Sequence, residues 1–250
     1  MCGPTGIAFG TRVLTSELVA GRDVLEVGAR DFNGSIRPHV ESLGPARYLG
    51  TDMEMGSGVD EVVDAADLVR RFGPESFDLV ITTEMVEHTR DWRIVVSNLK
   101  RVLRPGGHLM LTTRSPGFKY HGYPYDFWRY TPADLRTIFS DLDILTIEDD
   151  PESPGVFMLA RRRDIFTEWA GRVALVSIIT GRREYEVSDR RIRIFRLILV
   201  SRMRIGSVRW PLRRLWRRIL ATAKRARNGL WRLLPESTRS FLKRRVFRRV

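Results

Sequence analysis

Short apolar runs alternate with amphipathic segments between Val24 and residue 163. Buried strands are predicted at seven of these runs: Val24–Val27, Arg47–Thr51, Gly58–Val63, Phe77–Thr82, His108–Thr113, Leu142–Glu148 and Val156–Ala160. Apolar residues at helical spacing predict helices between them: Ser35–Leu43, Asp67–Phe72, Asp91–Leu103 and Pro132–Phe139. Strands that alternate with helices form a parallel sheet covered on both faces. The pattern therefore predicts a doubly wound α/β domain.

The same pattern divides the chain into three parts. Pro105-Gly106-Gly107 is expected to end the preceding helix and to turn the chain into the next strand. The alternation stops near Asp164, so we place a domain at residues 1–163. Residues 164–189 form a connecting region whose mixed pattern predicts no definite element. Residues 190–250 form a tail in which Arg is enriched.

Charge separates the tail from the rest of the chain. The 250 residues carry a formal net charge of +13. Residues 1–189 hold 22 Lys and Arg against 29 Asp and Glu, a net charge of −7. Residues 190–250 hold 21 basic residues and a single acid, Glu236, a net charge of +20. An acidic domain followed by a strongly basic tail indicates two functions that have to be argued separately.

Composition narrows the class of protein. A hydrophobic content of 43% excludes a wholly disordered chain. The single cysteine, Cys2, excludes a disulfide framework or a cysteine-based zinc site within this chain and suits a reducing compartment. Uncharged stretches near the tail, such as Val173–Thr180, are far shorter than the roughly 18–20 residues of a membrane helix. We therefore expect a cytoplasmic protein without a membrane span.

Two amphipathic helices are predicted in the tail, at Pro211–Arg227 and Pro235–Val250. In the first, an apolar stripe that includes Trp216 lies opposite a face rich in Arg, which is typical of helices at a membrane interface. Each basic side chain near an anionic leaflet contributes about 1 kcal/mol. We therefore expect residues 190–250 to hold the protein peripherally on an anionic membrane surface.

Other partners for the tail stay open. Arg clusters also bind the phosphates of nucleic acids, and a basic helix can dock on another protein. A solvated, partly disordered tail is a further alternative. The broad apolar stripe with tryptophan favours lipid over nucleic acid, because binding in a groove does not require such a stripe.

Polar residues follow three consecutive predicted strands. The first strand runs into the turn Glu26-Val27-Gly28-Ala29-Arg30-Asp31-Phe32-Asn33-Gly34-Ser35, in which Gly28 allows the backbone to approach a ligand closely. The second strand is followed by Asp52, where doubly wound folds bind ribose hydroxyls. The third is followed by an acidic turn that begins at Asp64. These strand ends meet at one edge of the sheet, which predicts a nucleotide site there.

Four segments carry further motifs in this order: VLEVGARDFNGS, YLGTDMEMGSGVDEVVDAADL, FDLVITTEMVEH and LKRVLRPGGHLMLTTRS. Together they resemble class I S-adenosylmethionine-dependent methyltransferases. The resemblance is strongest to the bacterial, methyltransferase type 11-like group, which has a VLEVGxRxxNGS turn and a later segment similar to GFKYHGYPYDFWRYTPADL. It covers about residues 20–163 and implies a Rossmann-like, mostly parallel seven-stranded sheet that binds S-adenosylmethionine.

The resemblance also implies which residues contact the cofactor: Glu26, Gly28, Asp52, Met53, Asp64, Ala65 and Glu84. The buried turn after the first strand would frame the methionine end. Asp52 would bind both ribose hydroxyls, and Met53 would pack on the adenine. Arg30 departs from the commoner family pattern, which has a second glycine at this position.

The string Glu84-Met85-Val86-Glu87-His88 follows a predicted strand. On a helix, Glu84, Glu87 and His88 would share one face, and two carboxylates with an imidazole suit Mg²⁺ or Mn²⁺. The same ExxEH string binds a divalent metal in small-RNA ribose 2′-O-methyltransferases and occurs in ubiquinone-pathway O-methyltransferases, which by resemblance makes His121 a further ligand. Related methyltransferases carry Glu-His at this place without metal, so a structural role for His88 stays open.

Methyl transfer to a hydroxyl requires removal of its proton, and His88, His121 and Asp126 are the candidate catalytic residues. They lie in or near the aromatic segment Gly117–Tyr130, whose ring faces and polar tips suit a sugar or ring-containing acceptor. An aromatic cluster that braces a loop over the cofactor is the alternative for this segment.

We therefore expect an S-adenosylmethionine-dependent methyltransferase that O-methylates a small-molecule, saccharide or lipid-linked acceptor at the cytoplasmic membrane surface. The ExxEH string and the basic tail support an RNA ribose 2′-O-methyltransferase as an alternative. Arg30 in the glycine turn supports a second alternative, a binding module of this fold without catalytic activity.

Overall fold

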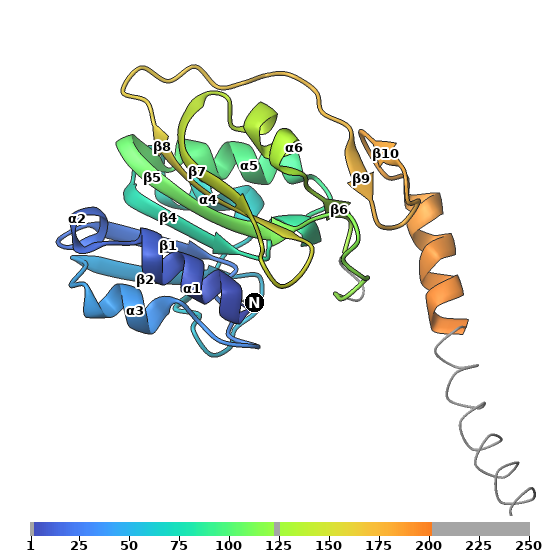
Figure 1. The fold of residues 1–250 in the computed structure, drawn as a ribbon, viewed down its shortest axis with the longest axis horizontal. Coiled ribbons are helices and arrows are strands. Elements are labelled where there is room, and N and C mark those ends of the chain that lie inside the picture. The colour runs from blue at the N-terminus through green and yellow to red at the C-terminus, as the bar shows by residue number, and fades with distance from the viewer. Residues whose placement is uncertain (1–2, 123–125, 202–250) are drawn as a thin grey trace, which may run out of the picture. The chain divides into compact units, whose positions relative to one another are not determined.

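A seven-stranded sheet forms the centre of the computed structural model, which describes residues 3–122 and 126–201. Its strands run in the order β3-β2-β1-β4-β5-β8-β7 (Figure 1). Their bounds are β1 (Asp23–Val27), β2 (Arg47–Asp52), β3 (Glu61–Val62), β4 (Phe77–Thr83), β5 (Leu103–Arg114), β7 (Leu142–Asp149) and β8 (Gly155–Arg162). Strand β8 is antiparallel to both its neighbours, and the other pairs are parallel. The predicted Rossmann-like, doubly wound fold is confirmed.

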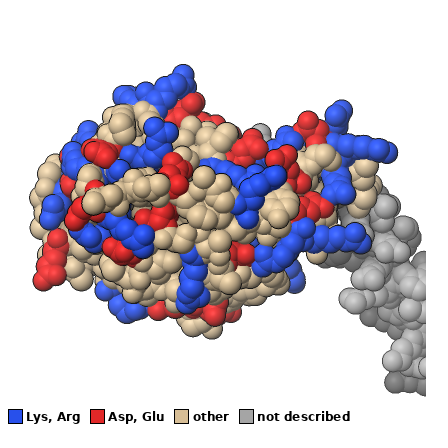
Figure 2. All heavy atoms as spheres, turned by 90° about the horizontal axis from the view of Figure 1, so that it is seen from above, with Lys and Arg blue, Asp and Glu red and all other residues tan. Residues whose placement is uncertain are grey.

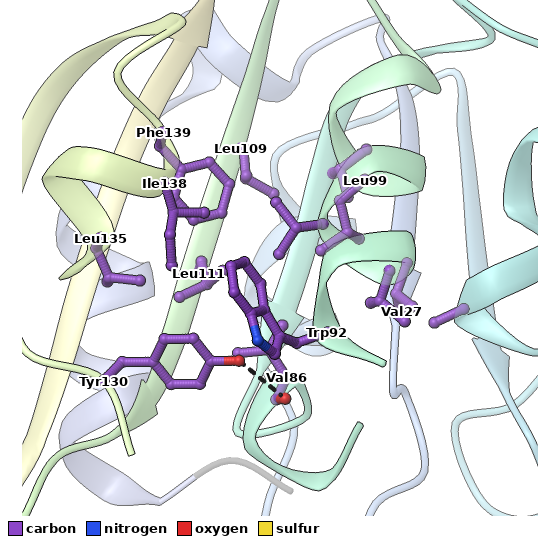
Figure 3. Close-up of a cluster of buried hydrophobic side chains, with 14 of the residues drawn as sticks. Val27, Val86, Trp92, Leu99, Leu109, Leu111, Tyr130, Leu135, Ile138 and Phe139 are labelled. Carbon is purple, nitrogen blue, oxygen red and sulfur yellow. Dashed lines mark hydrogen bonds between the residues drawn. The ribbon is translucent and has the colours of Figure 1, made fainter. Parts of the chain in front are cut away.

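Helices cover both faces of this sheet. They are α1 (Pro4–Val13), α2 (Ser16–Val19), α3 (Arg37–Ser42), α4 (Leu68–Phe72), α5 (Trp92–Arg101) and α6 (Pro132–Ile138), with 3₁₀ turns η1 (Ala65–Asp67) and η2 (Val86–His88). Successive residues of β5 point to opposite faces, so Leu109 and Leu111 join one core and Met110 joins the other. Figure 3 shows the first core, where Trp92 and Leu99 of α5 lie beside β5.

The structure corrects the expectation for Pro105-Gly106-Gly107. These residues are not a turn before the strand, because β5 already begins at Leu103 and includes them. The pairing of β4 with β5 shifts register between Phe77 and Leu79, opposite this segment. Gly106 has a φ of +75°, which glycine adopts without the steric cost of a side chain, so the strand passes through an irregularity where the sequence suggests a break.

The connecting region adds a second, small sheet. Strands β9 (Leu175–Ser177) and β10 (Arg183–Glu184) pair with β6 (Trp128–Arg129) in the order β10-β9-β6. Ile178 N–H also donates to the Phe127 carbonyl oxygen at 3.0 Å. The region after residue 164 is therefore fastened to the segment that precedes α6, a pairing that local patterning does not reveal.

The chain divides into two compact units, residues 1–192 and residues 193–250. A helix covers residues 189–201. Cys2 and the predicted tail helices at Pro211–Arg227 and Pro235–Val250 lie outside the described residues. In the part of the chain that is described, every helix is too short or too polar to cross a membrane.

Candidate functional site

The predicted nucleotide site lies where β1 and β2 end. Gly28 and Ala29 donate their N–H groups to the Thr51 carbonyl oxygen at 2.8 and 3.0 Å, which joins the turn after β1 to the end of β2. Gly28 has a φ of +80°, and a Cβ there would lie 2.8 Å from the side chain of Met85. Both the backbone conformation and the lack of space require glycine at this turn, which is half-buried at Gly28.

Glu26 lies at the base of this turn and is 2% exposed. Burial raises the pKa of its carboxyl group to about 7, although a hydrogen bond from the Tyr48 hydroxyl to Oε2 opposes the shift. The proton is held tightly because a carboxylate loses its hydration when it is buried. Glu26 therefore changes charge near neutral pH, beside the turn that contains Gly28.

Asp52 ends β2 and is oriented by backbone donors. Its Oδ1 accepts from Glu54 N–H at 3.2 Å and its Oδ2 from Arg30 N–H at 3.4 Å. The neighbouring Met53 is 60% exposed, so its thioether side chain has a face free to pack on a planar ring. A carboxylate beside an exposed apolar side chain, next to a glycine turn, fits the ribose and base of a nucleoside.

The acidic turn after β3 lies one strand further along the same edge. The Asp64 side chain accepts from Ala66 N–H at 2.9 Å and caps η1, while Ala65 is 7% exposed. Asp64 also lines an open cavity of about 350 Å³ together with residues of β3, η1 and α4. The turn thus offers a small buried side chain and a capped backbone at the edge where the sequence predicts the adenine.

Glu84 occupies a position different from that of the other two residues of the ExxEH string. Its φ is +49°, and its Oε1 accepts from Arg114 Nη2 at 2.5 Å. The string forms the short turn η2 instead of an α-helix, so Glu84, Glu87 and His88 do not share a helix face. Glu84 faces the Arg114 guanidinium at the end of β5, which also pairs with Asp150 at 3.1 Å.

Glu87, His88 and His121 do come together. Each offers a ligand atom, and these atoms lie within 4.8 Å of one another; we refer to the three as the histidine cluster. Glu87 is fully buried and its Oε2 accepts from Thr113 Oγ1 at 2.8 Å. Among the described residues, Glu87 Oε1 and His121 Nε2 are buried without a hydrogen-bond partner and lie 3.9 Å apart. Buried polar atoms without hydrogen-bond partners require an explanation, and a bound water or ion between the two atoms would supply one.

The turn that carries this cluster is anchored in the hydrophobic core. Val86 is 1% exposed, and its carbonyl oxygen accepts from the buried Tyr130 hydroxyl at 3.3 Å (Figure 3). Phe127 N–H donates to the Glu87 carbonyl oxygen at 2.9 Å. The positions of Glu87 and His88 are therefore fixed by packing of η2 against the segment 126–130.

Asp126 orients the imidazole of His121. Its Oδ2 accepts from His121 Nδ1 at 3.1 Å and from His121 N–H at 2.9 Å. Both oxygens also accept from Arg129, at 2.6 and 2.9 Å. Burial favours the neutral acid, but the hydrogen bonds from Arg129 and His121 hold the pKa of Asp126 well below its usual range. Asp126 is a permanent carboxylate that fixes His121 with Nε2 toward Glu87.

Sequence reasoning missed the partners that hold these groups. Tyr48, Thr113, Arg114 and Arg129 each bind a predicted site residue. Arg129 is 1% exposed and also donates to the carbonyl oxygens of Phe118, Lys119 and Trp128. The sequence indicates such a role for Arg129 only through its position in the aromatic segment Gly117–Tyr130, because a lone Arg among aromatic residues is a candidate for a buried ion pair.

Comparison with known proteins identifies a methyltransferase domain in this chain. Residues 25–111 match the methyltransferase domain family. The ubiquinone biosynthesis O-methyltransferase of Pseudomonas syringae pv. tomato is 32% identical over 109 residues, 38% of this chain and 45% of that protein. The enzyme of the same description from Vibrio atlanticus is 26% identical over 117 residues, 42% of this chain and 48% of that protein. The chain thus spans about half the length of these curated relatives.

Solved structures show the same fold at low identity. A chain from the complex described as that of the Haloferax volcanii Trm112 methyltransferase activator and the putative methyltransferase matches with a TM-score of 0.51 and 14% identity, over 66% of this chain and 91% of that chain. The cyclase SpnF matches with a TM-score of 0.50 and 15% identity, over 64% of this chain and 80% of that chain. Because a methyltransferase and a cyclase both share it, the fold by itself does not determine the reaction.

Proposed function

Because the chain carries a methyltransferase domain of the class I S-adenosylmethionine-dependent family, we propose that it transfers a methyl group to a hydroxyl of a saccharide or lipid-linked acceptor at the cytoplasmic membrane surface. The observation that carries the proposal is the joining of two sites at one edge of the sheet. We refer to the turns after β1, β2 and β3, with Gly28, Asp52 and Asp64, as the cofactor edge. The Met85 side chain lies close to Gly28, and Met85 is two residues before Glu87 of the histidine cluster, so the two sites adjoin.

The cofactor edge would hold S-adenosylmethionine, which supplies a methyl group already activated on a sulfonium. Gly28 would let the backbone approach the methionine portion, and the Asp52 carboxylate would accept hydrogen bonds from the ribose hydroxyls. The exposed side chain of Met53 would pack on the adenine, and the turn formed by Asp64 and Ala65 would contact the adenine edge. Holding the acceptor in line with the methyl group supplies much of the rate acceleration in such a transfer.

The histidine cluster would remove the acceptor proton. His121 Nδ1 is engaged by Asp126, which leaves Nε2 as the basic atom of the ring. A hydroxyl that donates to Nε2 would lose its proton to His121 as the methyl group arrives, and the Asp126 carboxylate would stabilise the imidazolium that forms. In this scheme His121 is the base and Asp126 orients it.

A divalent metal is a second candidate occupant of the cluster. Glu87, His88 and His121 are hard or borderline donors. Glu87 Oε1 and His121 Nε2, which lack a hydrogen-bond partner among the described residues, could bind a cation. Such an ion would supply Lewis acidity toward the acceptor oxygen. It would also agree with an acceptor such as an RNA ribose.

Calorimetry with S-adenosylhomocysteine and methylation assays with chelator test these assignments together. We expect wild type to bind S-adenosylhomocysteine and Asp52→Ala to lose most of that affinity. His121→Asn should lose activity while cofactor affinity is kept. Absence of binding by wild type would leave a non-catalytic module as the remaining hypothesis. Activity that survives EDTA but not His121→Asn assigns the base, and activity lost with EDTA and restored by Mn²⁺ assigns the metal.

The membrane surface is proposed from the helix over residues 189–201, considered by itself. Ile194, Leu197 and Ile198 lie on one face and are 47%, 71% and 47% exposed. Arg190, Arg191 and Arg193 precede or flank them. An exposed apolar face beside Arg is typical of interfacial helices. On the face of the protein in Figure 2, by contrast, basic and acidic side chains are interspersed.

Co-sedimentation of the full chain with vesicles tests this surface. We expect binding to vesicles that contain anionic lipid and little binding to neutral vesicles. Replacing Ile194, Leu197 and Ile198 with Glu should weaken binding to anionic vesicles. Absence of binding to anionic vesicles would remove the membrane role, and binding of RNA in its place would favour the RNA alternative.

A further inference from the structure

Arg30 connects two loops of the cofactor edge. Its guanidinium forms an ion pair with Glu54 and lies 4.6 Å above the ring of Phe32. The Arg30 side chain is 30% exposed, so most of it is packed against its surroundings. Arg30 belongs to the turn after β1, whereas Glu54 belongs to the loop after β2. The contact therefore bridges the two segments that carry Gly28 and Asp52.

The loop after β2 passes directly against the Arg30 side chain. A Cβ at Gly56 would lie 2.8 Å from Arg30 Nε and 3.0 Å from its Cγ. A residue other than glycine at position 56 would push the Arg30 side chain away. Asp31 N–H also donates to the Ser57 carbonyl oxygen at 2.9 Å, which fastens the same two segments through their backbones.

Both ends of the ion pair reach the predicted ribose ligand. The N–H of Arg30 donates to Asp52 Oδ2 at 3.4 Å, and the N–H of Glu54 donates to Asp52 Oδ1 at 3.2 Å. The side chains of Arg30 and Glu54 thus close a ring of contacts around the Asp52 carboxylate. If this ring opened, each oxygen of Asp52 would lose a neighbour that limits its rotation.

We propose that Arg30 is a positioning residue that latches the two cofactor loops together and thereby sets the affinity for the cofactor. The inference rests on the proposed function, in which this edge binds S-adenosylmethionine. Arg30 acts through Glu54, Phe32 and the Gly56 backbone and does not touch the cofactor. With the loops joined beforehand, less ordering is required when the nucleoside binds, which lowers its dissociation constant.

Calorimetry of the full chain with S-adenosylhomocysteine tests the latch. We expect Arg30→Ala and Glu54→Ala each to raise the dissociation constant about fivefold, since an exposed ion pair with added packing contributes modestly. The double variant should be no weaker than either single variant, because both remove the same contact. The exchanged pair Arg30→Glu with Glu54→Arg should recover part of the affinity.

Arg163→Ala is the matched control. Arg163 Nε donates to Asp143 Oδ1 at 2.8 Å in a similarly exposed ion pair. Asp143 lies at the start of β7, the outer strand on the side of the sheet away from β3, so this pair is remote from the cofactor edge. Arg163→Ala should leave the dissociation constant unchanged. Amide hydrogen exchange without cofactor gives a second readout, and residues 53–58 should exchange faster in Arg30→Ala than in wild type.

Three results would overturn the latch. Glu54→Ala binding as tightly as wild type while Arg30→Ala binds weakly would mean that Arg30 contacts the cofactor itself. Additive losses in the double variant would mean that the two side chains act separately. Unchanged affinity and exchange in both variants would show that the loops need no latch. A wild-type chain that fails to bind S-adenosylhomocysteine would instead refute the proposed function, and the latch with it.

Discussion

The cofactor edge and the histidine cluster both lie at the carboxyl ends of the parallel strands, but they are built differently. The cofactor edge consists of turns that directly follow β1, β2 and β3, and its groups are backbone atoms and short side chains near Gly28 and Asp52. The histidine cluster joins η2 to a segment more than thirty residues later in the chain. Its His121 is held by Asp126, which forms a buried ion pair with Arg129, and its Glu87 is held by Thr113.

This difference predicts which kind of substitution damages each site. A site made of backbone turns depends on local conformation, so it is damaged by a side chain where none fits. A site made of side chains from distant segments depends on the groups that orient them, so it is damaged by the loss of a buried partner. The following predictions test that contrast.

The largest expected effect follows from Asp126→Ala. It leaves the Arg129 guanidinium, which is 1% exposed, without its carboxylate, and breaking a buried ion pair in this way costs about 3–5 kcal/mol. We expect a large drop in the free energy of unfolding and loss of activity. If the two regions are independent, the folded fraction should still bind S-adenosylhomocysteine. Comparable loss of cofactor affinity would show that the regions are coupled.

The next largest effect is expected from the titration of the Glu26 carboxyl group, which makes the free energy of unfolding depend on pH. Its pKa is about 7 in the folded chain against 4.5 for the free group. Between these values the unfolded chain loses this proton while the folded chain keeps it, so folding is increasingly disfavoured as pH rises from 4.5 to 7. The full cost above pH 7 is about 3 kcal/mol.

Urea unfolding of wild type and Glu26→Gln across this range measures the cost. Gln keeps an oxygen that can accept from the Tyr48 hydroxyl but does not titrate. We expect the stability difference in favour of the variant to grow with pH and to level off above 7. A difference that stays constant from pH 4 to 8 would contradict the raised pKa.

Gly28→Ala tests the cofactor edge with a matched control. Gly28 and Gly21 both have positive φ values, +80° and +66°, but only at Gly28 would a Cβ meet a neighbour, Met85. Alanine at Gly21 should cost about 1 kcal/mol of stability and leave binding unchanged. Alanine at Gly28 should also raise the dissociation constant for S-adenosylhomocysteine about a hundredfold, equivalent to about 2.7 kcal/mol. Equal affinity in the two variants would contradict the close approach at Gly28.

The smallest effect is expected at Glu84. Its positive φ costs on the order of 1 kcal/mol, which the ion pair with Arg114 offsets. Glu84→Gly should relieve the strain and remove the pair, so the melting temperature should change little. Glu84→Ala should remove the pair but keep the strain, and should lower the melting temperature by a few degrees. If both variants melt alike, the backbone at Glu84 is not strained.

Much of the fold could be predicted from the sequence because its signals are local. The strands around Val24, Phe77 and His108 and the helix from Trp92 follow from apolar periodicity, which depends only on near neighbours in the chain. The pairing of β9 with β6 could not be predicted, since residues 175–177 carry no pattern that selects a partner about fifty residues earlier. Nor could the continuation of β5 through Gly106, where long-range pairing overrides a local break signal.

The turns after β1, β2 and β3 and all three residues of the histidine cluster were named from the sequence, Glu87 and His88 in the ExxEH string and His121 by resemblance. The separation of Glu84 from that cluster was not predicted. The ExxEH string suggested that Glu84 joins Glu87 and His88, on the assumption of a helix. The structure forms a 3₁₀ turn and brings His121 to the cluster, while Glu84 faces Arg114. The roles of these residues in binding and catalysis stay predictions.

The sequence by itself predicted the order of the seven strands of the main sheet and of the helices between them, the glycine and acidic turns that follow β1, β2 and β3, and the separation of an acidic domain from a basic tail. Each depends on residues close together in the chain. Tertiary structure alone decided that Asp126 orients His121, that Arg129 holds Asp126, and that Arg30 meets Gly56. Those contacts form only after the sheet has brought separate loops to one edge, because burial and side-chain direction depend on the whole fold.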